Sequence, residues 1–266
     1  MEKITTDVYQ KIDNNLYNAD GDIWWKPDTV LHLLKTSVNP WRVSYMQKTI
    51  KKLGIDPNGK SALEVGSGGG ILTEEISKMG FTTTGIEPAE ESIRKAVNHA
   101  KTSGLTIQYD QGTGENLPYA DGSFDCVFCC DVLEHVQDLP KVIAEISRVL
   151  KPSGVFFYDT LNRTFISKLV AINIWQKWKR WAFMPPNVHV WEMFIKPTEI
   201  KELLQKNGFD WQEHKGSSPN VSIPKMLGYL RKRAKGEWTY ADLGKNFWLE
   251  ESGDMNILYA GYAIKK

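Results

Sequence analysis

Three shortages in this 266-residue sequence limit what the protein can be. Its only cysteines, Cys126, Cys129 and Cys130, lie close together, so we expect no disulfide framework and a reducing compartment. No run approaches the ~18 consecutive apolar residues that mark a membrane-spanning helix. Charge of neither sign is in excess, because 33 Lys and Arg stand against 32 Asp and Glu. Proteins that grip nucleic acid over a long footprint usually carry a basic excess, so we expect no nucleic-acid partner.

The composition is otherwise that of an ordinary globular protein, with 41% hydrophobic and 24% charged residues. The first residues, Met1–Tyr9, are polar and have no apolar segment of the kind found in secretory signals, which predicts a cytoplasmic protein. No internal repeat is visible. We expect an N-terminal helical segment over 1–53 and one main domain over 54–266.

Two hydrophobic periods alternate through the middle of the chain. Short β-branched or apolar runs predict strands, and helical periods lie between them. The expected strands are 61–65, 82–86, 105–109, 124–130 and 155–159. Beyond them we expect a helical insert at 165–183, strands at 209–214 and 256–264, and mostly loop with a short helix over 216–253. The pattern predicts an α/β fold with a doubly wound, Rossmann-like, seven-stranded sheet, N-terminal helices and a helical lid at about 163–196.

Two glycine motifs precede or follow these strands. The stretch from Gly54 to Ser61 matches the phosphate-binding P-loop pattern, but a helix precedes it and a strand follows it. A P-loop needs the opposite order, so that backbone N–H groups at a helix start meet the phosphates. A nucleoside-triphosphate site is therefore only a remote alternative.

The second motif is Glu64-Val65-Gly66-Ser67-Gly68-Gly69-Gly70, which follows a strand and opens a helix. It lacks the third glycine of the dinucleotide pattern, which favours a ligand without phosphates. Glu87 ends the next strand, 87 − 66 = 21 residues after Gly66, where a carboxylate can accept hydrogen bonds from a ribose. Further polar stretches at 112–115 and 131–135 also follow predicted strands, at the edge where such sheets bind ligands.

These four motifs, in this order, resemble the class I methyltransferases that use S-adenosylmethionine (AdoMet). The resemblance covers about 60–160. It implies that the glycine loop holds the methionine part of AdoMet and that Glu87 holds the ribose. The residues that it implicates in cofactor binding are Glu64, Gly66, Ser67, Gly68, Glu87, Thr113, Gly114 and Glu115. In many members of the family, the position of Thr113 is an Asp whose side chain contacts the adenine.

The flanking segments narrow the resemblance to the ubiquinone-biosynthesis O-methyltransferases. It is carried by Trp24-Trp25, by Asn39-Pro40-Trp41-Arg42, by 159–163 and by 188–197. It implies methylation of a phenolic oxygen on a catechol, with a polyprenylated quinone precursor as one candidate. It also implies that Arg42 and Cys130 contact AdoMet. Two alternatives stay open: a natural-product O-, N- or C-methyltransferase on the same frame, and a non-catalytic AdoMet-binding module.

A phenol must lose its proton before its oxygen attacks the methyl group, so a base or a metal ion is expected. Asp131, Glu134 and His135 have helical spacing and could face one way. The resemblance implies a divalent cation such as Mg²⁺ at that position, and a hard cation would hold both catechol oxygens. The alternative is that Glu134 and His135 only orient a helix. Glu134, His135 and His189 are the candidate catalytic groups.

The insert at 165–184 carries Trp175, Trp178 and Trp181 at intervals of three, with Lys177, Lys179 and Arg180 between them. Tryptophan with basic residues is typical of a helix that lies in a membrane interface. A lid over the active site explains the same composition. The insert therefore allows peripheral contact with the inner face of a membrane, and the sequence decides neither this nor the oligomeric state.

Overall fold

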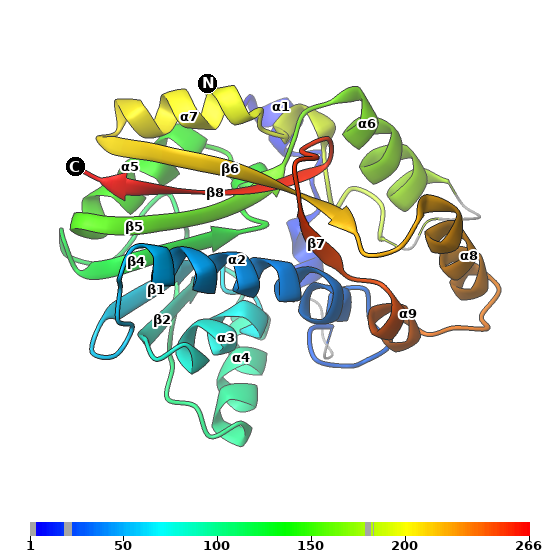
Figure 1. Ribbon diagram of the computed structural model, residues 1–266, viewed down its shortest axis with the longest axis horizontal. Coiled ribbons are helices and arrows are strands. Elements are labelled where there is room, and N and C mark those ends of the chain that lie inside the picture. Colours follow the sequence, from blue (N-terminus) through cyan, green and yellow to red (C-terminus); the bar gives the residue numbers. More distant parts are fainter. Residues whose placement is uncertain (1–3, 19–22, 179–181, 183) are drawn as a thin grey trace.

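One mixed sheet of eight strands organises the protein in the computed structural model, which describes residues 4–18, 23–178, 182 and 184–266. The strand order is β3-β2-β1-β4-β5-β8-β6-β7 (Figure 1). The strands are β1 Ser61–Val65, β2 Thr82–Glu87, β3 Gln108–Gln111, β4 Phe124–Cys130, β5 Leu150–Leu161, β6 Phe209–Pro219, β7 Leu249–Ser252 and β8 Leu258–Lys265. The doubly wound α/β prediction is confirmed.

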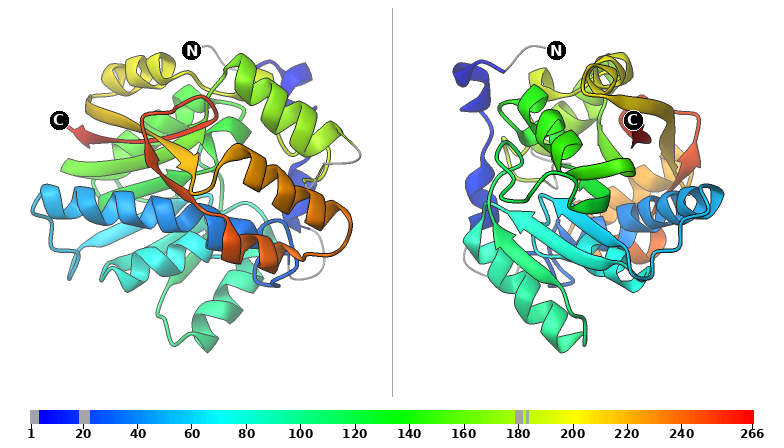
Figure 2. Two further views of the ribbon diagram at one scale, coloured as in Figure 1. Left: turned by 45° about the vertical axis from the view of Figure 1, so that its right-hand side comes forward. Right: turned by 90° about the vertical axis from the view of Figure 1, so that its left-hand side faces the viewer.

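Helices cover both faces of the sheet, as Figure 2 shows. They are α1 Thr6–Tyr9, α2 Asn39–Lys52, α3 Ile71–Lys78, α4 Glu90–Thr102, α5 Leu139–Val149, α6 Phe165–Ser167, α7 Pro197–Lys206, α8 Ile223–Ala234 and α9 Tyr240–Asn246. Shorter or irregular turns are η1 Asn14–Asn18, η2 Leu34–Val38, η3 Leu133–His135, η4 Lys168–Lys177 and η5 Trp191–Met193.

Strand β4 divides the core, because successive side chains of a strand point to opposite faces. Val127 and Cys129 pack with α5 and α7 on one face. Cys126, Phe128 and Cys130 pack with α2 and α3 on the other. All three cysteines are therefore small buried residues in the middle of the sheet, and all are free thiols.

The parallel half of the sheet positions the ligand site. Strands β1 to β5 pair in parallel, and the chain order reverses between β1 and β4. The chain continues from β1 to β2 on one side of this point and from β4 to β5 on the other. The carboxyl ends of these two strands therefore border a crevice, which is where open α/β sheets bind ligands.

The C-terminal half corrects two expectations. Strand β8 lies antiparallel between β5 and β6, and β7 pairs antiparallel with β6, which gives one strand more than the seven predicted. The extra strand comes from 216–253, which we expected to be mostly loop. That segment also forms α8 and α9. Strand β7 is four residues long and mostly polar, so its sequence shows no alternation of apolar and polar residues that would predict a strand. It is a strand because it pairs with β6.

The N-terminal segment and the lid differ in local geometry from expectation. The helical segment expected over 1–53 begins with a four-residue α1 followed by η1, and its longest described helix is α2. The insert begins as α6 and continues as η4, a π-helical run. Lys179, Arg180 and Trp181, used in the interpretation of the insert, lie outside the described residues. Within the described part of the chain, no helix is both long and apolar enough to cross a membrane. The boundary at residue 54 stays a prediction.

Candidate active site

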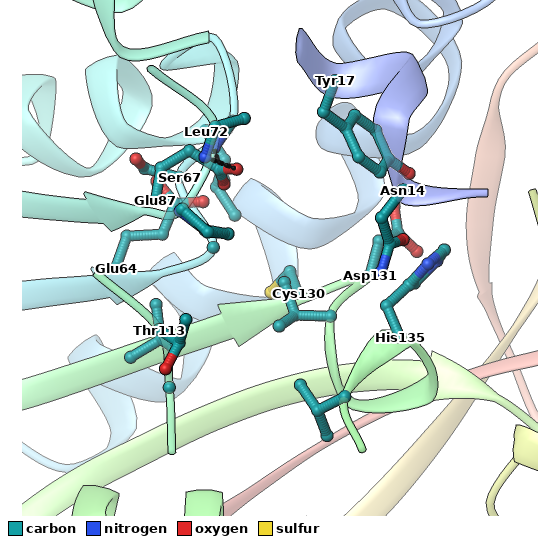
Figure 3. Close-up of a pocket in the computed structure, with 18 of the residues that line it drawn as sticks. Asn14, Tyr17, Glu64, Ser67, Leu72, Glu87, Thr113, Cys130, Asp131 and His135 are labelled. Atoms are coloured by element: carbon teal, nitrogen blue, oxygen red, sulfur yellow. Dashed lines mark hydrogen bonds between the residues drawn. The ribbon is translucent and has the colours of Figure 1, made fainter. Parts of the chain in front are cut away.

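A pocket of about 340 Å³ opens at the carboxyl ends of β1, β2 and β4 (Figure 3). A volume of a few hundred cubic ångströms suits a cofactor-sized ligand. Twelve of the predicted site residues line it: Arg42, Glu64, Gly66, Ser67, Gly68, Glu87, Thr113, Gly114, Glu115, Cys130, Asp131 and His135. Glu134 and His189 do not line it. Their ligand atoms lie within 4.8 Å of one another and of His135, which does line the pocket.

The glycine loop turns tightly after β1. Gly66 has φ +75° and Gly68 has φ +50°, in the left-handed region that favours glycine. The N–H groups of Gly66 and Ser67 both donate to the carbonyl of Ile86, at 2.8 and 3.0 Å, which ties the loop to β2. The loop therefore presents backbone to the pocket.

Glu87 is held at the end of β2 by backbone donors. Its Oε2 accepts from the N–H of Gly68 and its Oε1 from the N–H of Ala89, each at 3.0 Å. Burial raises its pKa, and these hydrogen bonds oppose that rise. A buried carboxylate that is held beside the glycine loop in this way is well placed to accept hydrogen bonds from the hydroxyls of a ribose.

The lining of the pocket is acidic. Four carboxyl groups, those of Glu64, Glu87, Glu115 and Asp131, face one cation, Arg42. Glu64 is buried, accepts a hydrogen bond from the Thr73 hydroxyl, and has a pKa raised by burial to about 8. Such a site disfavours phosphates and suits a ligand that brings positive charge, as the sulfonium and ammonium groups of AdoMet do.

Arg42 is already engaged by protein groups. Its Nε and Nη2 donate to the two oxygens of buried Asp159, at 2.6 and 2.9 Å, in a fork. It also forms an ion pair with Asp131. Although burial acts to raise the pKa of Asp131, this guanidinium holds that pKa below its usual value. Arg42 therefore shapes the pocket floor by fixing Asp131.

The predicted metal set of Asp131, Glu134 and His135 is only partly assembled. The ligand atoms that gather are those of Glu134, His135 and His189, which lie within 4.8 Å of one another. Asp131 is paired with Arg42, and its backbone has φ 53°, which turns the chain away from helical geometry. The helical spacing that we expected for 131–135 is therefore wrong. Only Leu133–His135 forms a short turn.

This cluster contains three buried polar atoms that lack a hydrogen-bond partner among the described residues. Glu134 Oε1, His135 Nδ1 and His189 Nδ1 are buried and have no hydrogen-bond partner, while Glu134 Oε2 accepts from Thr160 at 2.8 Å. Burial lowers the pKa of His135 to about 3 and that of His189 to about 4, so both imidazoles are neutral. Buried polar atoms normally have partners, and a carboxylate with two neutral histidines is a donor set that fits a divalent cation.

The P-loop-like stretch lies away from the pocket. Gly54 and Gly59 sit in the turn between α2 and β1, and a Cβ on either glycine would meet nothing within 4 Å. The Lys60 ammonium contacts Asp125 at 3.4 Å. A helix precedes this stretch and a strand follows it, so the phosphate-binding arrangement is absent and the nucleoside-triphosphate alternative is wrong.

Sequence reasoning missed the roof of the pocket. Trp24 lies over the glycine loop, and its Nε1 donates to Ser92 Oγ at 2.9 Å. Tyr17 stacks on Trp24 with ring centroids 5.8 Å apart. Figure 3 shows Tyr17 and Asn14 facing Asp131 and His135, across the pocket from Glu64 and Glu87. The Trp24-Trp25 pair was visible in the sequence, but nothing local indicated what it covers.

Comparisons with known proteins agree with this geometry. The family model described as "Methyltransferase domain" matches residues 63–158. A ubiquinone biosynthesis O-methyltransferase of Rhizobium leguminosarum bv. trifolii is 33% identical over 207 residues, which cover 75% of this chain and 81% of the relative. One from Methylococcus capsulatus is 36% identical over 195 residues, or 73% of this chain and 79% of that protein.

Solved structures match the fold. The YcgJ protein of Bacillus subtilis aligns with a TM-score of 0.58 at 19% identity, over 84% of this chain and 97% of that one. An AdoMet-dependent methyltransferase of Aquifex aeolicus aligns with a TM-score of 0.56 at 15% identity, over 91% and 100% of the two chains. At these identities the likeness concerns the fold alone.

Proposed function

The chain belongs to the family of ubiquinone biosynthesis O-methyltransferases, and we propose from this premise that it moves a methyl group from AdoMet to a phenolic oxygen of a quinone-pathway small molecule. The observation that carries the proposal is the acidic pocket at the sheet's switch point, with Glu87 fixed on the glycine loop. Such a pocket accepts a sulfonium cofactor and disfavours phosphate-bearing ones.

We assign the cofactor contacts to the residues on the sheet side of the pocket. Glu87 would accept hydrogen bonds from the ribose hydroxyls. Gly66, Ser67 and Gly68 would lie against the methionine part, with Glu64 supplying negative charge for its ammonium. Thr113, Gly114 and Glu115 would border the adenine, and Cys130 and Arg42 the floor. Trp24 would close the cofactor from above, since it covers the loop.

The acceptor would enter beside His135, on the side bounded by Asn14 and Tyr17. We propose that the phenolic proton passes to Glu134 by way of His135 at the pocket wall, because burial raises the pKa of Glu134 to about 8 and lowers the pKa of both histidines. The phenolate oxygen then attacks the methyl carbon in line. The C–O bond forms as the C–S bond breaks, and the electron pair returns to sulfur to give S-adenosylhomocysteine. Holding the two reactants in line supplies much of the rate.

A divalent cation fits the same cluster. Glu134 and the two histidines would hold it through the atoms that lack partners, and two imidazole ligands suit a transition-metal ion better than the Mg²⁺ that the resemblance implied. When bound, such an ion lowers the pKa of a phenol and neutralises developing charge. Asp131 would contribute only at a distance, because Arg42 engages it.

We propose a polyprenylated catechol as the acceptor, taken up at a membrane surface through the lid insert. Phe165 is 79% exposed, and Ile166, Leu169 and Trp178 on the same insert are also exposed, which a lid with its apolar face inward would not require. Exposed tryptophan and aliphatic residues beside Lys168 and Lys177 are typical of interfacial segments.

The test is methyl transfer from radiolabelled AdoMet to a water-soluble short-chain prenyl catechol, with product analysis. We expect the methyl ether, and we expect Glu87→Gln to lose binding of S-adenosylhomocysteine in calorimetry by roughly tenfold or more, since hydrogen bonds to a charged group are each worth about 1.5–3 kcal/mol. Exposed Glu90→Gln, at the first residue of α4, is the control. Cofactor binding with transfer to amines or carbon instead would favour the natural-product alternative. Binding without transfer to any acceptor would favour a non-catalytic module.

A further inference from the structure

Helix α8, Ile223–Ala234, is a surface element to which the methyltransferase site gives no role. It contains no buried residue, although helices of its length normally bury an apolar stripe. Its neighbour α9 anchors the segment: a Cβ on Gly244 would meet the Thr36 side chain, and the N–H of Tyr240 donates to Asp28. The segment is therefore fixed to the body of the protein through α9, which leaves α8 on the outside.

The outward face of α8 combines aliphatic and basic side chains. Ile223 and Leu227, four residues apart, share one face and are 65% and 40% exposed. Residues 223–235 carry five basic residues and no acidic one, in a chain whose net charge is only +1. The basic residues are Lys225, Arg231, Lys232, Arg233 and Lys235. In the described structure only Lys235 among them forms an ion pair, with Glu237 at 3.4 Å. Lys225, Lys232 and Arg233 lie over aromatic rings of the same segment, and all five except the half-buried Arg233 are exposed.

Exposed apolar side chains gather at the same end of the molecule. The described residues expose eight large apolar side chains, and seven of these lie within 165–178 and 223–248. The seven are Phe165, Ile166, Leu169, Trp178, Ile223, Leu227 and Trp248, whereas Val97 lies elsewhere, on α4. Both Figure 1 and the left view of Figure 2 place α8 at the end of the molecule that carries α6 and η4.

We propose that α8 is an independent binding element for an anionic lipid bilayer, with Ile223 and Leu227 inserted at the headgroup boundary and the basic residues against the lipid phosphates. Each basic residue near an anionic leaflet contributes about 1 kcal/mol. The helix thereby adds an electrostatic contact to any that the basic residues of the lid insert supply. The inference does not depend on the identity of the methyl acceptor.

The aliphatic residues decide between a bilayer and other polyanions. A nucleic acid would pair with the cations but offers no medium for Ile223 and Leu227, whose exposure costs free energy in water. A bilayer interface takes both kinds of side chain at once, because apolar groups enter the acyl boundary while cations stay at the phosphates.

The experiment is vesicle flotation of the full chain, without substrate, on phosphatidylcholine vesicles with and without phosphatidylglycerol. We expect binding that needs phosphatidylglycerol and weakens with salt. Removing two of the charges, with Arg231→Gln and Lys232→Gln together, should weaken partitioning roughly thirtyfold. Lys51→Gln with Lys101→Gln makes the same change of net charge at exposed positions elsewhere and should leave partitioning near wild type.

The apolar contribution is tested with Leu227→Asp, against Val97→Asp on α4 as the matched exposed position. Only the α8 variant should reduce partitioning. Equal partitioning of the α8 variants and their controls would overturn the proposal, as would α8-dependent binding to a polyanion such as heparin without binding to vesicles. Methyl transfer to a soluble catechol, measured without vesicles, should stay unchanged in every variant. That assay separates a failure of this inference from a failure of the proposed function.

Discussion

Trp24 and Gly68 are in direct contact, so closely that a Cβ on Gly68 would come within 2.4 Å of the Trp24 ring carbon Cη2. The glycine is therefore required by the aromatic roof as well as by any ligand beneath it. A residue far from the glycine loop in sequence decides how much space that loop leaves.

Gly68→Ala should weaken binding of S-adenosylhomocysteine more than tenfold, because the methyl group forces Trp24 to move and the backbone is strained at φ +50°. Calorimetric titration measures the effect. Gly54→Ala is the control, since Gly54 has φ +66° and open space around it. If the roof is the cause, Gly68→Ala should cost much less affinity in a Trp24→Ala background. An equal loss in both backgrounds would assign the whole effect to the loop itself.

Glu64 should make the unliganded protein less stable as pH rises. Burial raises its folded pKa to about 8, so the stability it contributes is present below the unfolded pKa of about 4.3 and is lost as pH rises through about 8. The melting temperature of the wild type should fall relative to Glu64→Gln between about pH 5 and pH 9. A constant difference between the two across this range would contradict the assignment.

Cofactor binding should also release a proton below pH 8, if the ammonium of the ligand ionises Glu64. Calorimetry with S-adenosylhomocysteine in two buffers of different ionisation enthalpy reports the proton directly. The release should disappear in Glu64→Gln. Its persistence there would place the titrating group elsewhere in the pocket.

Asp159→Asn should destabilise the fold by about 1.5–3 kcal/mol, because the buried guanidinium of Arg42 loses its forked carboxylate and keeps only Asp131 as a charged partner. Urea denaturation measures this. The exposed pair of Arg94 and Glu91 provides the comparison, since Glu91→Gln should cost less than about 1 kcal/mol. A similar loss in the free energy of unfolding for both variants would show that burial does not strengthen the ion pair of Arg42.

Mn²⁺ binding, followed by electron paramagnetic resonance without substrate, should depend on His189. His189→Ala and Glu134→Gln should each abolish it, because they remove members of the ligand cluster. His214→Ala, at a partly buried histidine bonded to Tyr158, is the control. If Asp131→Asn abolished Mn²⁺ binding and His189→Ala retained it, the ligands would instead be the set predicted from the sequence, which includes Asp131.

Much of the frame could be predicted from local pattern. The strand and helix periods, the glycine loop after β1 and the position of Glu87 were all legible, since parallel strands end at one edge and so collect their terminal residues. Strand β7 was not legible, because its four residues become a strand through pairing with β6. The cluster of Glu134, His135 and His189 could be predicted only in part, because the sequence pattern grouped Asp131 with Glu134 and His135.

The sequence by itself determined the parallel half of the sheet, its ligand edge and the residues that line the cofactor half of the pocket. Tertiary structure alone decided which groups meet there: Arg42 pairs with Asp131 and Asp159, His189 joins Glu134 and His135, and Trp24 covers Gly68. The physical reason is the range of the interactions. Periodicity and turns are set by neighbours in the chain, whereas ion pairs, lone pairs without partners and ring contacts depend on side chains that only the packed fold brings together.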